Sequence, residues 1–181
     1  TAQIDYLVND NTVDVLKGNP NINNLVVFDK KAQNSTVELI KFALGLRKNK
    51  YDIVIDAYSK LQSWIIVLLC GGKTKISYKK IGRPFLYDYN VPLAENPETN
   101  LGLAIERRLS LLSPLRIMAE IDPIPKVFLD KKERLFATTL FAQHKVDPNR
   151  KTVMISVLGS EKLKTYPLSY MAEVINSISD T

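Results

Sequence analysis

The segment "YDIVIDAYSKLQSWIIVLLCGGKTKISY", residues 51–78, gives the clearest indication of the fold. It opens with an apolar run rich in β-branched residues, which is typical of a strand buried on both faces. A polar turn follows, and then a very apolar helical stretch that ends on Gly71 and Gly72, residues that suit a left-handed helix cap. A second β-type run, "TKISY" at residues 74–78, completes the segment. The pattern predicts a β-α-β unit.

Strand-like and helical patterns alternate along the rest of the chain. Further strands are predicted at residues 4–8, 24–28 and 152–158, and further helices at residues 35–49 and 99–115, after Asp130 and after Pro167. Repeated βα units whose strands are nearly continuous Val, Ile and Leu predict an α/β fold with a doubly wound parallel sheet, which is Rossmann-like. In such sheets ligands bind beyond the carboxyl ends of the strands.

The helix predicted at residues 35–49 carries a clear start signal. Ser35 and Glu38 have the spacing of a capping box, in which the serine accepts from the N3 amide and the glutamate reaches back. Val37, Ile40 and Leu44 then share one face of the helix. Asp130 and Glu133 are spaced in the same way and predict the start of a later helix.

Composition limits the classes of protein to consider. The chain has 181 residues and 45% hydrophobic content, enough to bury one substantial core and to begin a second. Its longest apolar run, Trp64 to Cys70, is far short of the ~20 residues that a bilayer crossing requires. A single cysteine, Cys70, rules out an internal disulfide, and His144 is the only histidine, so we expect both to be structural, with no metal site and no cofactor.

The charge indicates an anionic partner. The formal net charge is +6 and the pI is near 9.3, but no long basic block and no nucleic-acid motif are present, so we expect no nucleic acid partner. The densest basic cluster is Lys73, Lys75, Lys79, Lys80 and Arg83. Two interpretations stay open: a solvated loop beside a strand, or contact of Lys79, Lys80 and Arg83 with phosphate or a membrane surface.

A strand-loop-helix pattern lies near the end of the chain, in "VLGSEKLKTYPLSYMAEVI" at residues 157–175. The loop brings together Gly159, which lets backbone approach a ligand, the hydroxyl of Ser160 and the charge of Lys164. Pro167 suits the first turn of the helix, whose N-terminal amides favour anions. The pattern predicts an anion site, although many α/β turns contain glycine and lysine without any ligand. The apolar helix residues Leu168, Met171, Ile175 and Ile178 are expected to anchor the helix to a sheet.

The polar stretch "VDPNRK" at residues 146–151 has the turn residues of a linker. We therefore predict a first domain over residues 1–147 and a second over residues 148–181. The second would supply only one strand and one helix, too little to bury a core of its own, so we expect it to be incomplete.

Several segments, in order, resemble the ADP-heptose:lipopolysaccharide heptosyltransferases, glycosyltransferase family nine. The family opens its second domain with a strand, a small-residue loop and Lys-x-Trp-Pro before a helix; here Gly159 and Ser160 are followed by Lys164 and Pro167, with Tyr166 in place of tryptophan. The resemblance continues in "IDYLVNDNTVDVLKGNPNINNLVVFDK", "KYDIVIDAYSKLQS", "TKISYKK", "FLYDYNVPL" and "AIERRLSLLSPL".

The resemblance implies a two-domain GT-B fold and inverting transfer of a heptose from an ADP-heptose type of nucleotide-sugar donor. Residues 1–147 would be the acceptor-side domain without its first strand, and Gly159, Ser160 and Lys164 would hold the donor diphosphate. No Asp-x-Asp triplet occurs, so a metal-independent reaction fits better. The family's catalytic aspartate has no counterpart and would lie before Thr1, so we expect residues 1–181 alone not to transfer sugar.

On the acceptor side, Asp56 ends a predicted buried strand, with Lys60 and Gln62 just beyond it. These three residues are candidates for contact with a phosphorylated lipopolysaccharide core at the cytoplasmic face of the bacterial inner membrane, where the protein would be peripheral. Alternatively, Asp56 caps the following helix. The family often has a basic residue where Gln62 stands, so the acceptor can differ. Two other functions stay open: a non-catalytic nucleotide- or sugar-binding module, and another GT-B enzyme such as a sugar-nucleotide epimerase.

Overall fold

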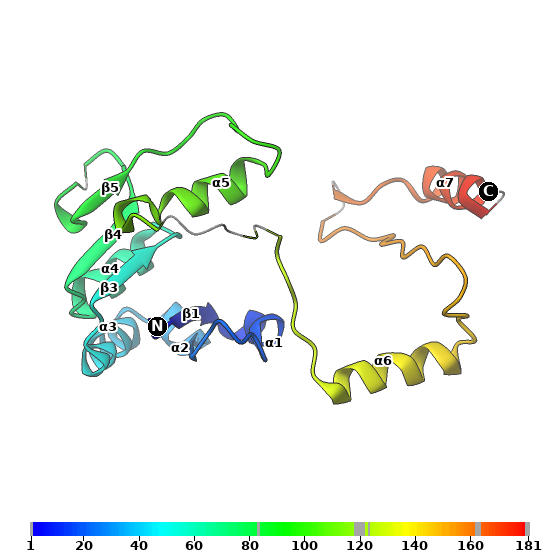
Figure 1. Cartoon of the computed structure of the whole chain (residues 1–181), viewed down its shortest axis with the longest axis horizontal. Coiled ribbons are helices and arrows are strands. Elements are labelled where there is room, and N and C mark those ends of the chain that lie inside the picture. The colour runs from blue at the N-terminus through cyan, green and yellow to red at the C-terminus, as the bar shows by residue number, and fades with distance from the viewer. Residues whose placement is uncertain (1, 83, 118–121, 123, 162–163, 180–181) are drawn as a thin grey trace. The chain divides into compact units, whose positions relative to one another are not determined.

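The computed structural model describes residues 2–82, 84–117, 122, 124–161 and 164–179. The chain divides into two compact units, Thr1–Leu129 and Asp130–Thr181 (Figure 1). The helix that begins after Asp130 therefore belongs to the second unit. The predicted domain boundary after residue 147 falls inside the second unit and stays a prediction.

The first unit alternates strands and helices. Its strands are β1 (Asp5–Asn9), β2 (Asn24–Phe28), β3 (Ile53–Asp56), β4 (Thr74–Tyr78) and β5 (Tyr89–Val91). Its α-helices are α1 (Val13–Leu16), α2 (Lys30–Asn34), α3 (Thr36–Gly45), α4 (Leu61–Leu69) and α5 (Leu103–Ser110). Short 3-10 helices are η1 (Asp10–Thr12), η2 (Leu46–Asn49), η3 (Pro84–Leu86) and η4 (Ser113–Leu115).

All of the strand pairs are parallel. β1 pairs with β2, and β4 lies between β3 and β5, so that Ile76 is opposite Ile55 on one side and Tyr89 on the other. The hydroxyl of Tyr51 donates to Asp5 Oδ2 at 2.8 Å and joins the start of β3 to the start of β1. The predicted parallel α/β class is confirmed, with the described strands in two sheets.

The predicted strands of the first unit form at or within one or two residues of their expected positions, but β5 was not predicted. It is three residues long and lies in a proline- and asparagine-rich passage, too short for an alternating pattern to stand out. The Lys79 amide donates to the Val91 carbonyl at 2.7 Å, so β5 is held by its pairing with β4. The helix predicted at 99–115 forms in part, as α5 and η4.

The β3-α4-β4 unit forms in the predicted order, but β3 is not buried on both faces as expected, because Ile53 and Ile55 are 45% and 39% exposed. Gly71 follows the helix with φ +76°, the left-handed conformation expected of a cap. Gly72 has another role, because a methyl group on it would lie 2.4 Å from Val54 Cγ2. Glycine there allows the chain leaving α4 to pass close to β3.

Two hydrophobic clusters make up the core of the first unit. One joins β2, α2, α3 and α4 through Phe28, Ala32, Leu39, Ala43 and Ile66. The other joins β4 and β5 to the end of α5 through Ile76, Tyr78, Val91 and Leu111. Burial of these side chains is the main stabilising contribution to the unit.

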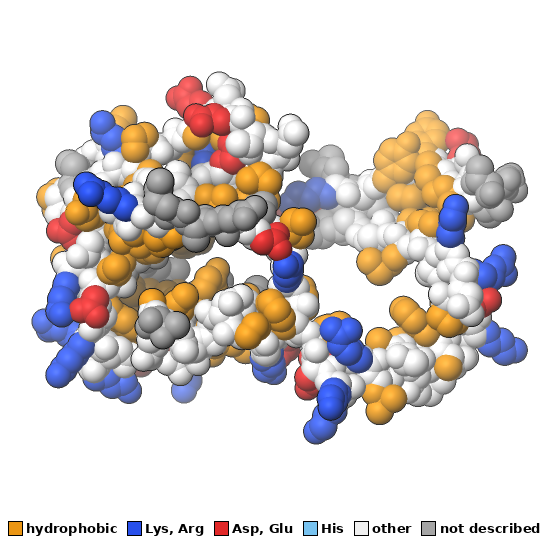
Figure 2. Space-filling view, viewed as in Figure 1, with side chains coloured by type: hydrophobic (Ala, Val, Ile, Leu, Met, Phe, Trp, Pro, Cys, Tyr) orange, Lys and Arg blue, Asp and Glu red, His pale blue; other side chains and the backbone are white. Residues whose placement is uncertain are grey.

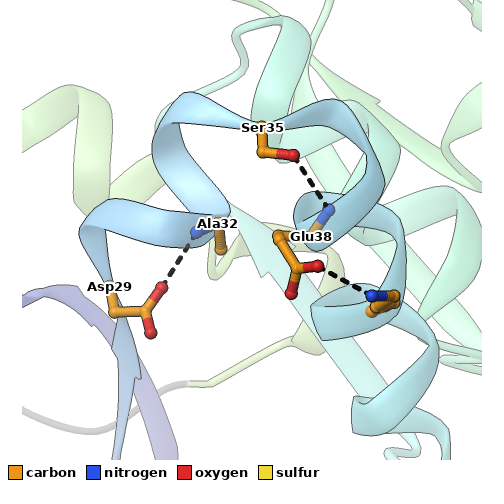
Figure 3. A network of polar contacts seen from close by, with 5 residues as sticks. Asp29, Ala32, Ser35 and Glu38 are labelled. Atoms are coloured by element: carbon orange, nitrogen blue, oxygen red, sulfur yellow. Dashed lines mark hydrogen bonds and ion pairs between the residues drawn. The ribbon is translucent and has the colours of Figure 1, made fainter.

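Helix α3 begins as predicted but buries a different face. Ser35 accepts a hydrogen bond from the Glu38 amide at 3.4 Å, as Figure 3 shows, and the Glu38 carboxylate binds Lys41 at 2.7 Å rather than reaching back to the cap. The shared face of Val37, Ile40 and Leu44 is exposed, with Val37 60% exposed. Leu39 and Ala43 point into the core instead. Both stripes are apolar, so the sequence pattern alone did not distinguish them.

The second unit contains α6 (Lys131–Gln143) and α7 (Leu168–Ser179). The predicted capping box is confirmed: the Glu133 amide donates to Asp130 Oδ1, and the Asp130 amide to Glu133 Oε2, both at 2.8 Å. The strand predicted at residues 152–158 is wrong for this structure, in which that stretch has no regular secondary structure. In the described part of the chain no strand pairs with it, and an isolated strand leaves its backbone groups without partners.

Hydrophobic side chains lie on the surface of both helices of the second unit, as Figure 2 shows over α6 and α7. They are Leu135, Phe136, Leu140 and Phe141 on α6, and Leu168, Tyr170, Val174, Ile175 and Ile178 on α7. The expectation that Leu168, Ile175 and Ile178 anchor α7 to a sheet is therefore not met, because no sheet forms among the described residues of this unit.

Candidate functional site

The first group of predicted site residues lies at the carboxyl end of β3 and β4. Asp56 is the last residue of β3 and is only 5% exposed. Its Oδ1 accepts the amides of Tyr58 at 3.0 Å and Ser59 at 2.7 Å. Its Oδ2 accepts the hydroxyls of Ser63 at 2.8 Å and Tyr87 at 2.6 Å. Both carboxylate oxygens are thus engaged inside the protein. The two amides that Asp56 accepts precede α4, whose N-cap is Lys60, so Asp56 orders the loop before the helix and does not cap it.

Lys60 and Gln62 belong to the start of α4 and differ in what they offer a ligand. The Lys60 ammonium lies 4.7 Å from the centre of the Tyr58 ring, and the lysine is exposed. The Gln62 side-chain amide donates to the Gln33 carbonyl at 2.7 Å and joins α4 to α2. Lys60 is therefore accessible to an anion, whereas the Gln62 amide nitrogen has a structural partner.

Lys79 and Lys80 follow β4 and are both exposed. The Lys80 ammonium donates to the Ser59 carbonyl at 2.7 Å, so the loop after β4 is joined to the loop after β3. Both lysines line a hollow of about 440 Å³ with Ile81, Gly82, Pro92 and Leu93. Arg83, the third predicted contact residue, lies outside the described residues.

This end of the sheet presents positive charge beside apolar surface. Ile81 is fully exposed and Leu93 is 43% exposed, next to the two lysines. Ammonium groups attract phosphate and carboxylate, and exposed apolar side chains favour acyl or ring surfaces. The hollow is therefore suited to an amphiphilic anion.

Tyr87 belongs to this region and was not predicted. It is 6% exposed, and burial together with the neighbouring Asp56 carboxylate raises the pKa of its hydroxyl well above the ordinary value. The hydroxyl therefore remains protonated and acts as a donor at neutral pH. No local pattern could have identified it, because its partner Asp56 is 31 positions away in the sequence.

The second group, Gly159, Ser160 and Lys164, lies in one exposed loop before α7. The Gly159 amide donates to the Thr165 hydroxyl at 3.1 Å, and a methyl group on Gly159 would lie 2.3 Å from the Lys164 carbonyl oxygen. The loop thus folds back on itself tightly, and only glycine fits at its first position.

Lys164 has an acidic neighbour that was not predicted. Its ammonium lies 3.3 Å from Glu161 Oε1, and both side chains are mostly exposed, at 62% and 64%. Such an exposed pair contributes little to stability and leaves the ammonium accessible to a stronger anion. Helix α7 begins directly after the loop, with the Met171 amide bonded to the Pro167 carbonyl at 3.0 Å. Lys164 therefore lies three residues before Pro167 at the start of α7, and the anion site expected there stays a prediction.

Metal clusters and membrane-spanning helices are both absent from the described part of the chain. Within the residues that the structure describes, no group of three or more His, Cys, Asp and Glu side chains could hold a metal ion. No helix in the same residues is long and apolar enough to span a bilayer.

Parallel α/β folds often bind phosphate-bearing ligands, and glycine-containing loops before a helix do so as well; the first unit has such a fold and the second has such a loop before α7. Residues 39–181 match the family model of glycosyltransferase family 9 (heptosyltransferase). Since the match spans most of the chain, the chain belongs to this family.

Individual relatives agree with this assignment. Lipopolysaccharide heptosyltransferase 3 of Escherichia coli is 29% identical over 124 residues, which cover 64% of this chain and 35% of that protein. The crystal structure of the glycosyl transferase family 9 from Veillonella parvula DSM 2008 superposes with a TM-score of 0.74 at 17% identity, covering 97% of this chain and 50% of that one. The second likeness supports the fold. The chain spans about a third of the first relative and half of the second.

Proposed function

We propose that the whole protein is a glycosyltransferase that moves a heptose or a related sugar from a nucleotide-sugar donor to a lipopolysaccharide core acceptor. The observation that carries this proposal is family membership over residues 39–181, which include the loop at residues 159–164. The name of the Escherichia coli relative, a lipopolysaccharide heptosyltransferase, supports the sugar and the acceptor. An ADP-linked heptose is the donor that we favour.

On the donor side, Gly159, Ser160 and Lys164 would hold the diphosphate against the N-terminus of α7. A carboxylate acting as general base takes the proton of an acceptor hydroxyl, and the hydroxyl oxygen attacks the anomeric carbon. The bond from that carbon to the diphosphate oxygen breaks, with inversion at the carbon. Negative charge then grows on the departing diphosphate. The Lys164 ammonium and the first amides of α7 would stabilise that charge without a metal ion. We assign the base to no residue of this chain.

On the acceptor side, Lys60, Lys79 and Lys80 would contact the phosphates of the glycolipid. Their support is the exposed charge at the carboxyl end of the sheet and the apolar hollow beside Ile81 and Leu93. A phosphorylated glycolipid presents both kinds of surface. We propose that the protein works at the cytoplasmic face of the inner membrane, where anionic lipids attract the same lysines.

Lys164→Ala in the whole protein tests the proposed donor site. A charge-assisted hydrogen bond contributes roughly 1.5–3 kcal/mol, so binding of ADP or an ADP-sugar should weaken by roughly one to two powers of ten. Isothermal titration calorimetry measures the affinity, and Lys151→Ala is the matched control because Lys151 is also an exposed lysine of the second unit. Glu161→Gln should preserve or improve binding, since it removes the carboxylate beside Lys164.

Two outcomes would contradict the assignment. Equal ADP affinity in parent and Lys164→Ala would remove Lys164 from the donor site. A large fall in melting temperature would show a structural role, whereas an exposed lysine should hardly affect stability.

A further inference from the structure

Buried polar side chains gather at one place in the first unit. Among the described residues, the buried polar or charged side chains are Asp56, Ser59 and Ser77, which are 5%, 2% and 0% exposed. The Ser77 hydroxyl donates to the backbone carbonyl of Asp56 at 2.8 Å, and the Tyr87 hydroxyl donates to the Asp56 carboxylate at 2.6 Å. A buried carboxylate is costly unless its oxygens are hydrogen-bonded, and here each oxygen has two donors. The network is therefore fully satisfied and should be rigid.

The network holds Ser59 in an unusual backbone conformation. Ser59 has φ +50°, in the left-handed region that residues with a Cβ atom rarely adopt. Its amide donates to Asp56 Oδ1 at 2.7 Å, and its side chain is buried against the hydroxyl of Tyr87. Such a conformation persists only where the surroundings impose it.

This conformation has a consequence outside the buried network. The Ser59 carbonyl accepts the Lys80 ammonium at 2.7 Å, and Lys60 is the next residue in the chain. A lysine side chain in solution samples many rotamers, and fixing it before a ligand arrives lowers the entropy lost on binding. The buried carboxylate is thus linked to Lys80 through the backbone of Ser59, whose amide binds Asp56 and whose carbonyl binds the Lys80 ammonium.

We propose that Asp56 and Tyr87 are positioning residues that hold Ser59 so that its carbonyl fixes the Lys80 ammonium at the carboxyl end of the sheet. Neither side chain touches the ligand in this arrangement, so Asp56 moves from the predicted acceptor contacts to a supporting role. The benefit of a fixed Lys80 for phosphate binding rests on the proposed acceptor function. The positioning of Lys80 by Ser59 does not depend on that function.

The experiment compares two deletions of a buried tyrosine hydroxyl. Tyr87→Phe removes one donor to Asp56 Oδ2, and Tyr78→Phe is the matched control, because Tyr78 is 8% exposed and its hydroxyl donates to the Arg107 carbonyl at 3.0 Å instead of to Asp56. Acetic anhydride labels the whole protein under limiting conditions, and mass spectrometry gives the acetylation rate of Lys80 relative to Lys79.

In the parent protein Lys80 should react more slowly than Lys79, because its ammonium is held by Ser59. Tyr87→Phe should raise the relative rate of Lys80 by about 2- to 10-fold, the factor that corresponds to one lost hydrogen bond. Tyr78→Phe should leave the ratio of rates unchanged, and this separates positioning from general loosening. An unchanged ratio in folded Tyr87→Phe would overturn the proposal.

If Tyr87→Phe does not fold, Ser63→Ala replaces it, because this change removes the other donor to Asp56 Oδ2. The relative acetylation rate of Lys80 should then rise by a smaller factor. An unchanged rate would equally overturn the proposal.

A second arm with inorganic phosphate separates this inference from the proposed function. Phosphate should slow the acetylation of Lys80 in the parent and less so in Tyr87→Phe. If phosphate protects neither lysine while Tyr87→Phe still raises the Lys80 rate, the positioning holds and the acceptor role of the lysines fails. If phosphate protects Lys80 equally in both proteins and the ratio is unchanged, the positioning is wrong and the acceptor role stands.

Discussion

Two strand-like runs of this chain carry the same Ile-Ser pair and reach different states. In the first unit, Ile76 and Ser77 belong to β4, and both side chains are 0% exposed. In the second unit, Ile155 is half-buried and Ser156 is exposed, within a stretch that forms no strand. β4 has β3 and β5 on its two sides, whereas no described strand lies beside residues 152–158.

The difference lies in the partners and not in the residues themselves. The Ser77 hydroxyl reaches across to the Asp56 carbonyl at 2.8 Å, while Ser156 bonds within its own run, to the Leu158 carbonyl at 3.5 Å. A strand gains stability only when its backbone groups pair and one face is covered. The similar sequences therefore predict a strand in both units, but only the run in the first unit has neighbouring strands to pair with and forms one.

The largest expected effect is the contrast between Ile76→Ala and Ile155→Ala. Ile76→Ala opens a cavity in the buried cluster and should lower the unfolding free energy by about 2–5 kcal/mol. Ile155→Ala should stay within about 0.5 kcal/mol, as for surface changes. Urea unfolding followed by circular dichroism reports both units, and the fluorescence of the single tryptophan, Trp64, reports the first. Equal losses would contradict the difference between the two runs, because they would require residues 152–158 to be packed in solution.

Helix caps give the next effect. Loss of an N-cap side chain costs about 0.5–2 kcal/mol of helix stability, so Asp130→Ala should reduce the helicity of α6, seen as a weaker circular dichroism signal at 222 nm. Since α6 has no buried residues, the urea midpoint reported by Trp64 fluorescence should not move.

Ser35→Ala removes a longer capping bond, of 3.4 Å. This change should lower the urea midpoint reported by Trp64, because α3 is packed in the core. A shift of the Trp64 midpoint by Asp130→Ala would show that the units are coupled.

The smallest effect concerns pH. The side chain of Asn24 and the hydroxyl of Tyr51 hold the pKa of Asp5 below its usual value by hydrogen bonding to the carboxylate. The pKa is lower in the folded state, so this contribution to stability is present above the unfolded pKa and is lost as pH falls through the folded one. Between about pH 6 and about pH 3, the parent should lose more stability than Asp5→Asn.

Trp64 fluorescence in urea at each pH measures that difference. Glu161→Gln is the control, because its exposed pair with Lys164 in the second unit should add no comparable dependence. The same pH slope in parent and Asp5→Asn would show that the link from β1 to the start of β3 does not stabilise the first unit.

The candidate site also contains residues that are close together in the sequence and residues that come from distant segments. Gly159, Ser160 and Lys164 could be assigned together because they are within six positions of one another and the helix start follows. Asp56 was predicted correctly as the end of a strand, although Ile53 and Ile55 of that strand are exposed rather than buried. Its partners Ser63 and Tyr87 come from later segments. The supporting role that we propose for Asp56, in place of acceptor contact or a helix cap, rests on those partners, which the residues next to Asp56 do not indicate.

Features that depend on a few neighbouring residues could be predicted from the sequence: the β3-α4-β4 order, the caps at Ser35 and Asp130, and the left-handed turn at Gly71. Tertiary structure alone decided which face of α3 is buried, the pairing of β5 with β4, and the absence of a strand at residues 152–158. Local signals act over three or four residues through backbone geometry and capping bonds. Strand pairing and burial depend on contacts between residues far apart in the chain, which a local pattern does not contain.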